Sequence, residues 1–430
     1  MKAMRKLTFT FLLAAAVCAF AQPQQTMHLT LAEAQRLAIA NNPRVSAARL
    51  TAAAAYEVPK QYSSAMMPSV GASLTGVGAD DGSRLGAGAL NNPVVYSRLG
   101  SGVVVNQLIT DFGRTRQLTG MAKLQAQAQD QVTQETRADI LLGTSEAYFN
   151  VLRNHALLTV ANETVNARQL VVDQITALAN ANLRSQLDVS FANVNLADAR
   201  LMQVEAQNNV SASEAQLAAI MGLPNQTAFT VADEPLPAPL PDRVADLIAQ
   251  AIQQRPELSE LRLRQNAAAS FARAEHDLYY PSVSAIGSMG LIPQSYTDLP
   301  GKYGAVGLNV TIPVFNGGLF HARSAEARFQ AEAAAQNITD EQNRIIRDVR
   351  VAWLNANSAY DKIALSQQLV SQAQMALDLS QSRYQLGLSS FVEVSQAQLN
   401  LTGAQIALTN AQYDYQAQHI AVDYQVGTLR

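Results

Sequence analysis

The sequence contains few charged residues, few aromatic residues and a single cysteine. Charged residues make up 15% of its 430 residues, compared with about 25% in ordinary soluble domains, which is unusual for a cytosolic enzyme. The net charge of −3 excludes a strongly basic nucleic-acid-binding protein. Because 48% of the residues are apolar, a disordered chain is excluded as well. Aromatic residues account for only 6%, so the core cannot be mainly aromatic.

The cysteine, Cys18, lies in an N-terminal segment with the features of a signal peptide. Three basic residues come first: Lys2, Arg5 and Lys6. An apolar run at residues 7–16 follows, and Ala19-Phe20-Ala21 supplies a cleavage motif. We expect removal of residues 1–21, which leaves an exported chain without disulfides or thiolate metal sites. The alternative is a lipoprotein signal acylated at Cys18, which the bulky Val17 disfavours.

Long hydrophobic runs and catalytic motifs are also missing. Beyond the signal segment, no run reaches the roughly 20 apolar residues that a transmembrane helix requires. The five histidines show no metal-ligand spacing: His28, His155, His276, His321 and His419. Gly317-Gly318 lacks the lysine and spacing of a phosphate-binding loop, and no nucleophile elbow or paired catalytic carboxylates occur. We therefore expect no enzymatic activity, no cofactor and no metal.

What the sequence does contain is an internal duplication. Met67-Pro68-Ser69-Val70 corresponds to Tyr280-Pro281-Ser282-Val283, 213 residues later. Ala147-Tyr148-Phe149-Asn150 corresponds to Ala352-Trp353-Leu354-Asn355, but at an offset of 205, which also relates many later positions. A single change of offset is typical of one surface loop that differs in length. Each half is therefore predicted to be one structural unit.

The predicted organisation is a signal peptide (1–21), a first repeat (22–224), a proline-rich connector (225–243) and a second repeat (244–430). In the first repeat we expect a helix, a β-hairpin at about 68–110 and a long helical hairpin at 114–221. In the second we expect a helix, a β-hairpin at about 281–315 and a long helical hairpin at 319–426. Loops are expected at 79–97 and 291–302, and both first helices are expected to break near a proline, Pro43 or Pro256.

The long helices show heptad spacing, which indicates coiled-coil packing. One predicted seam consists of Val349, Trp353, Ala356, Tyr360 and Ile363. A second consists of Val394, Leu401, Leu408, Tyr415 and Val422, and a third of Val189, Leu196, Val210 and Leu217. The many alanines would allow the helices to approach closely. We therefore expect these aromatic residues to be part of the packing and not of a cofactor site.

The four predicted strands are about ten residues long and alternate in polarity, which suits a tilted strand in an outer membrane. A small soluble sheet that caps the helices is the alternative. Four strands cannot close into a membrane barrel, and open edges in lipid would leave costly unpaired backbone groups. If the strands enter a membrane, several chains must contribute to one barrel, so we expect an obligate oligomer.

Taken together, these features resemble the outer membrane efflux proteins, the TolC-like family. Three stretches carry the resemblance most specifically: Arg383-Tyr384-Gln385-Leu386-Gly387-Leu388, Asp111-Phe112-Gly113-Arg114 and Pro313-Val314-Phe315-Asn316-Gly317-Gly318. The resemblance covers nearly the whole mature chain. It implies a mixed α and β fold in which a homotrimer forms a twelve-strand transmembrane β-barrel, four strands per chain, with a long α-helical coiled-coil barrel in the periplasm. It also implies partnership with a periplasmic adaptor and an inner-membrane pump.

The resemblance also suggests site residues. The tips of the helical hairpins, expected to meet the adaptor, would lie at Asn182, Leu183, Gly387 and Leu388. Gly387 is equally expected to be a helix C-cap. The periplasmic aperture would be formed by Asp188, Tyr384, Glu393 and Gln396. In the family, a tyrosine and an acidic partner link the closed state, and Tyr384 and Asp188 match them. Glu393 would contribute to an acidic, cation-selective ring.

The sequence departs from the family pattern at two of these positions. Ser389 stands where the archetype has a linking arginine, and Gln396 stands at a second acidic ring position. Arg184 or Arg383 could therefore hold the closed state instead, and solvated surface roles for these charges remain an alternative.

The sequence predicts a passive outer membrane exit duct for an efflux or type I secretion system. The alternative is an exported coiled-coil scaffold or adhesin without a channel. Drug, metal-ion and protein substrates are not distinguished by the sequence.

Overall fold

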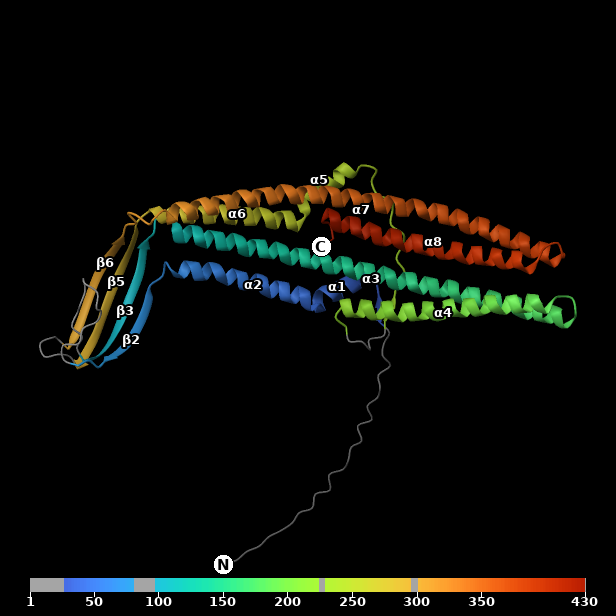
Figure 1. Cartoon of the computed structure of the whole chain (residues 1–430), viewed down its shortest axis with the longest axis horizontal. Coiled ribbons are helices and arrows are strands. Elements are labelled where there is room, and N and C mark those ends of the chain that lie inside the picture. Colours follow the sequence, from blue (N-terminus) through green and yellow to red (C-terminus); the bar gives the residue numbers. More distant parts are fainter. Residues whose placement is uncertain (1–26, 81–96, 224–228, 295–300, 430) are drawn as a thin grey trace, which may run out of the picture.

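The computed structural model describes residues 27–80, 97–223, 229–294 and 301–429. The predicted signal peptide with Cys18, the start of the connector and parts of both predicted loops lie outside these residues. The described chain is a long rod, with a β-sheet at one end and helices running away from it to the other end (Figure 1). None of the described helices combines the length and apolar character needed to cross a membrane.

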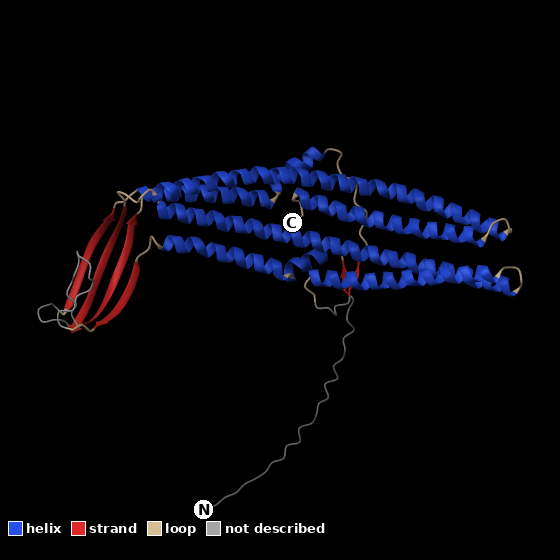
Figure 2. Cartoon of the chain, in the orientation of Figure 1, coloured by secondary structure: helices blue, strands red, loops and turns tan. Residues whose placement is uncertain are grey.

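The sheet contains four antiparallel strands in the order β2-β3-β5-β6. Its strands are β2 (Ser69–Val77), β3 (Arg98–Thr110), β5 (Ser282–Gln294) and β6 (Lys302–Thr311). The two hairpins, one from each half of the chain, join through the pairing of β3 with β5 (Figure 2). β5 continues to Gln294, into the segment predicted as a loop, and β6 ends before the predicted limit of 315. Opposite Pro293, which has no amide hydrogen, the register of β3 shifts between Leu99 and Ser101.

The two faces of the sheet differ in polarity. The strand register places one set of mostly apolar side chains on the same face: Val70, Leu74, Val103, Met289, Val306 and Leu308. The opposite face carries small polar side chains, among them Ser69, Ser73, Asn106, Ser284, Asn309 and Thr311. The apolar side chains are exposed in the single chain. The outer strands β2 and β6 each have only one neighbour within the described sheet.

Two long helices run the length of the rod, and shorter helices pack along each. The long helices, α3 (Arg114–Asn180) and α7 (Leu319–Gln385), contain 67 residues each, which corresponds to about 100 Å. The helix α2 (Pro43–Ser64) packs on the sheet-proximal part of α3, and α4 (Gln186–Ile220) on its distal part (Figure 1). Similarly, α6 (Pro256–His276) and α8 (Phe391–Val426) pack along α7. α6 also contacts α3, which joins the two halves.

The remaining helices are short. α1 (Leu31–Asn41) and α5 (Val244–Gln254) precede α2 and α6, and a single 3₁₀ turn at Asp277–Tyr279 leads into β5. Each helix break is followed by a proline, Pro43 or Pro256, at the first position of the next helix. This position suits proline because the first amide of a helix has no intrahelical partner.

The packing seam of α7 differs from the predicted one. Its buried residues step by three and four: Val349, Ala352, Ala356, Ala359 and Ile363. Trp353 is only half-buried and Tyr360 is exposed, so Ala352 and Ala359 hold the buried positions predicted for them. The Tyr360 ring nevertheless packs against Tyr415 of α8, with 5.1 Å between centroids. The alanines occupy the seam because they allow α8 to approach closely, while the aromatic rings lie beside it. On α8, Val394, Tyr415 and Val422 are buried as predicted.

The two halves of the chain are connected near the middle of the rod (Figure 1). β1 (Met27–Leu29) pairs in parallel with β4 (Phe229–Val231), a small sheet that the sequence did not predict. Four side chains donate hydrogen bonds to connector carbonyls: Tyr148 to Ala232 (2.6 Å), Gln416 to Glu234 (2.9 Å), Tyr415 to Ala238 (2.7 Å) and Trp353 to Pro241 (2.9 Å). Two of the donors, Tyr148 and Trp353, are equivalent positions of the duplication. The connector is therefore a fixed strap across the helices, and not only a linker.

A candidate gate at the helical tips

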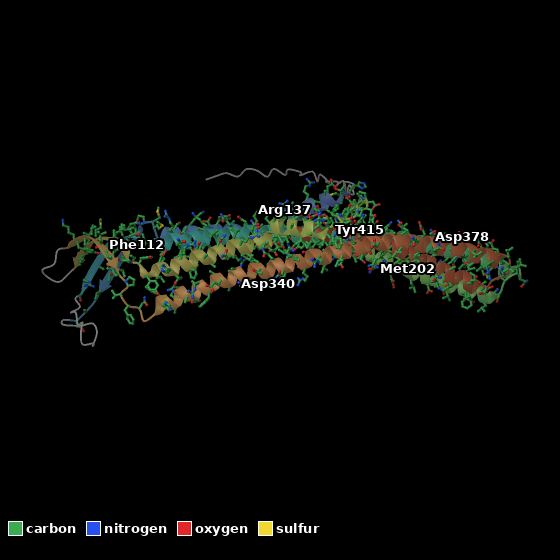
Figure 3. The ribbon with its side chains drawn as sticks, turned by 90° about the horizontal axis from the view of Figure 1, so that it is seen from above. Phe112, Arg137, Met202, Asp340, Asp378 and Tyr415 are labelled. Atoms are coloured by element: carbon green, nitrogen blue, oxygen red, sulfur yellow. The ribbon has the colours of Figure 1, made fainter. Side chains whose placement is uncertain are left out.

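The turns of both helical hairpins lie together at the end of the rod opposite the sheet (Figure 1). They comprise residues 181–185 between α3 and α4 and residues 386–390 between α7 and α8. In Figure 3, Phe112 marks the sheet end, Tyr415 the middle and Asp378 the part of α7 that leads to the tips.

The two turns have the same backbone motif. Asn182 and Gly387 adopt left-handed conformations, with φ of 59° and 76°. After each, a leucine amide donates to the carbonyl five residues earlier: Leu183 to Leu178 (2.9 Å) and Leu388 to Arg383 (2.8 Å). This is the Schellman pattern that ends many helices. Leu183 and Leu388 are 68% and 67% exposed, so each tip presents a leucine to its surroundings.

Tyr384, on the last turn of α7, is the centre of the polar contacts between the tips. The Arg184 guanidinium lies 4.1 Å from the centroid of its ring. Nη2 of Arg184 also donates to the Tyr384 carbonyl at 2.8 Å. The ring also contacts Phe391, with 5.8 Å between centroids. The Tyr384 hydroxyl oxygen is buried and has no hydrogen-bond partner among the described residues.

Asp188 lies close to this group without bonding to Tyr384. It is half-buried in the first turn of α4, where a carboxylate stabilises the helix N-terminus. Burial raises the pKa of Tyr384; Arg184 opposes the change and Asp188 adds to it. No hydrogen bond joins Asp188 to Tyr384 in the described part of the chain. Asp188 and Tyr384, the predicted linking pair, therefore interact through the charge of the carboxylate and not through a hydrogen bond.

The other two predicted aperture residues bind other partners. Glu393 is exposed, and its Oε1 is 3.7 Å from Nε of Arg383, an ion pair within the α7–α8 hairpin. Exposed pairs of this kind contribute little stability. Gln396 donates to Asn400 one turn along α8, at 3.0 Å. Ser389, at the position of the missing arginine, has its hydroxyl 3.5 Å from the Ser380 carbonyl.

Sequence reasoning missed a second bridge between the hairpins. Nδ2 of Asn195 on α4 donates to the Ser395 hydroxyl on α8 at 2.5 Å. Arg168 is only 5% exposed and donates to the Asn195 carbonyl at 2.6 Å, which fixes this part of α4. Burial lowers the pKa of Arg168. The sequence did contain a signal for this contact: an arginine lies on the buried seam of α3, between Thr164 and Val172, where a charged side chain needs a partner.

A groove of about 810 Å³ lies beside these contacts. Its walls are mainly apolar and come from α3, α7 and α8; they include Leu178, Leu377, Phe391 and Val394. Arg168, Arg184 and Tyr384 also line it. Among the described residues, no group of histidine, cysteine, aspartate and glutamate side chains is arranged to hold a metal ion.

A second group of charges lies near the middle of the rod, far along α3 from the tips. Burial, with nearby Glu257, Asp139 and Glu260, raises the pKa of Glu135 to about 7, and Arg255 opposes this. Arg255 is itself buried and binds Glu257 at 2.5 Å and Gln425 at 2.8 Å. The positive charge of Arg255 therefore stabilises the carboxylate of Glu257 more than that of Glu135.

Comparison with known proteins gives a consistent result. The sequence matches the family described as "Outer membrane efflux protein" over residues 35–223 and 247–428. It is 26% identical over 408 residues to the outer membrane protein TolC of Escherichia coli K12, covering 90% of this chain and 80% of that protein. It is 24% identical over 341 residues to the solvent efflux pump outer membrane protein SrpC of Pseudomonas putida, covering 75% and 70%. Among solved structures, the outer membrane protein VceC from Vibrio cholerae has the same fold, with a TM-score of 0.77, 20% identity and coverage of 92% and 96%.

Proposed function

The chain belongs to the outer membrane efflux protein family, and on that premise we propose that three copies of it form a duct through which an efflux system releases its substrates. It is an outer membrane channel protein and not an enzyme. Such a duct is passive: the energy comes from the pump, and the channel provides the route. The polarity of the four-stranded sheet is the observation that supports this proposal most strongly.

The apolar face of the sheet suits contact with outer membrane lipid. Val306, at the centre of β6, is 91% exposed in the single chain. The opposite face, with serine, asparagine and threonine, suits a water-filled lumen. The ten residues of β6 span about 34 Å, enough to cross the roughly 25 Å apolar band of an outer membrane at a tilt. The free edges of β2 and β6 would be paired in a closed barrel of twelve strands.

Aromatic side chains mark a boundary at the helix-proximal end of the sheet. Phe112, Tyr279, Tyr280 and Phe315 lie next to the strand ends and are all exposed. Rings of Phe112 and Tyr280 contact each other with 6.0 Å between centroids. Aromatic girdles of this kind are typical where an outer membrane barrel meets the aqueous phase. In the proposed trimer, the helices beyond this boundary form a tunnel in the periplasm.

The helices also present surface for neighbouring copies. α4 carries an exposed apolar stripe at heptad-like spacing: Leu187, Phe191, Val194 and Leu201. A second stripe follows α7 and ends at its C-cap: Leu365, Leu369, Leu379 and Leu386. Both lie on the distal half of the rod, outside the seams that are buried within one chain. Packing of such stripes between copies would close a helical barrel.

The tips would form the periplasmic end of the duct. In this proposal, Asp188, Tyr384, Glu393 and Gln396 surround the aperture. The exposed turns with Leu183 and Leu388 contact a periplasmic adaptor, which links the duct to an inner-membrane pump. Three copies of Glu393 would form an acidic ring that favours cations.

Conductance in planar lipid bilayers tests this function. Purified protein, extracted in detergent from outer membranes, is added to one side of the bilayer. The proposal predicts heat-modifiable trimers and discrete current steps. A water-soluble monomer that produces no current would contradict it and would favour the alternative, an exported coiled-coil scaffold or adhesin.

A further inference from the structure

We propose that Arg184 is the latch that holds the α3–α4 and α7–α8 hairpins together at the closed aperture, and that it binds the ring face and main-chain carbonyl of Tyr384, not the Tyr384 hydroxyl. This inference rests on the proposed function, because a latch matters only if the tips form the end of a duct. The residue that keeps the aperture closed would then lie in the turn between α3 and α4.

The geometry fits a latch because Arg184 makes two different contacts with one residue of the other hairpin. The guanidinium is 4.1 Å from the centroid of the Tyr384 ring, within the range of a cation–π interaction. It also donates to the Tyr384 carbonyl at 2.8 Å. That carbonyl lies in the last turn of the 67-residue helix α7. The C-terminal end of a helix has a partial negative charge, which favours a cation there.

The planar guanidinium is suited to both contacts at once. It can lie over an aromatic ring while its N–H groups point to an acceptor at the edge, which a lysine ammonium cannot reproduce. The turn after α3 holds Arg184 in place: Asn182 is left-handed, and the Leu183 amide binds the Leu178 carbonyl. The Tyr384 carbonyl is likewise fixed by the Gly387 amide at 3.0 Å. Both ends of the contact therefore lie on ordered turns.

The hydroxyl of Tyr384 is not needed for this contact. Its oxygen is buried and unpaired among the described residues, although Asp188 lies near enough to affect its pKa. A buried polar atom without a partner is unfavourable. Replacement by phenylalanine would keep the ring face and the main-chain carbonyl and remove only the unpaired hydroxyl. Tyr384→Phe is therefore expected to leave the aperture closed.

Arg383, a second cation at the tips, makes no bond to the α3–α4 hairpin among the residues that the structure describes. It pairs with Glu393 at 3.7 Å, and both residues belong to the α7–α8 hairpin. Both side chains are about half exposed. Arg383 is therefore a matched control: it has the same side chain, lies next to Tyr384 in sequence and differs in what it bridges.

The experiment compares channel opening of the full-length trimer in planar bilayers. Arg184→Ala removes both contacts and is expected to raise the fraction of time in the high-conductance state at least about tenfold. Arg184→Lys keeps the charge but loses the planar contact, so it is expected to open to an intermediate extent. Arg383→Ala and Tyr384→Phe are expected to behave like the wild type. Tyr384→Leu, which keeps the carbonyl but removes the ring, is expected to open the channel partly.

Two results would overturn the inference. One is an Arg184→Ala channel that opens no more than Arg383→Ala. The other is a Tyr384→Phe channel that opens as much as Tyr384→Leu, which would place the link at the hydroxyl. The second comparison does not depend on whether Arg184→Ala assembles. Failure of the wild-type protein itself to conduct would instead refute the proposed duct, so the two failures are distinguishable.

Discussion

An arginine on the apolar face of β6 is predicted to block assembly in the membrane, whereas one on the opposite face is tolerated. Val306 lies at the middle of the strand Lys302–Thr311 and pairs with Gly287, which offers no side chain to cover it. An arginine facing lipid at mid-depth costs about 2–4 kcal/mol. In the proposed trimer, which would carry the substitution three times, the penalty for Val306→Arg is roughly 6–12 kcal/mol.

The control is the neighbouring residue. Ala305 pairs with Ser288 on the polar face. An arginine at this position would therefore face the proposed lumen and remain hydrated. The assay measures the fraction of heat-modifiable oligomer in outer membrane preparations, followed by urea unfolding in lipid vesicles. We expect Ala305→Arg to assemble nearly as well as the wild type and Val306→Arg to be strongly depleted. Equal assembly of both variants, or a greater defect for Ala305→Arg, would refute the assignment of the faces.

Three further predictions concern the helices. Glu393→Gln should weaken cation preference, measured as the reversal potential across a salt gradient; unchanged selectivity would contradict an acidic ring. Tyr148→Phe removes the hydroxyl that bonds to the carbonyls of Leu29 (2.9 Å) and Ala232 (2.6 Å) and should lower the free energy of unfolding by about 1–2 kcal/mol; no loss in denaturant titrations would count against the strap. The pKa of Glu135 is raised from 4.5 to about 7 in the folded protein. Between these pH values the unfolded chain loses the proton and the folded chain keeps it, so the free energy of unfolding falls as the pH rises. Glu135→Gln should therefore stabilise the protein at pH 8 relative to the wild type and have little effect at pH 4, and the opposite trend in melting temperature would exclude this cause.

Regular spacing made the helical part of the fold predictable. The seven-residue repeat of Val394, Tyr415 and Val422 follows directly from coiled-coil geometry, and these residues are buried. On α7 the same reasoning favoured large residues over alanine, so it selected Trp353 and Tyr360 in place of Ala352 and Ala359. Periodicity alone cannot decide between adjacent positions when small residues allow the partner helix to come close.

Features that depend on contacts between distant parts of the chain were not predictable. The pairing of β1 with β4 involves only three residues in each strand, and Leu29, which is buried, packs with Tyr148 from α3. At the tips, the duplication gave equivalent positions for Asn182 and Gly387. It could not indicate which charged side chain crosses between the hairpins, because Arg184 and Arg383 are both plausible from spacing. The contact with Tyr384 depends on how the hairpins pack.

The central claim is that one chain supplies only part of a barrel. The most direct test is the mass of the detergent-solubilised complex, measured by light scattering with correction for bound detergent or by native mass spectrometry. We predict a single species containing three copies of the chain, since four strands from each are needed to close the sheet. A stable monomer under conditions that retain the strands would contradict it.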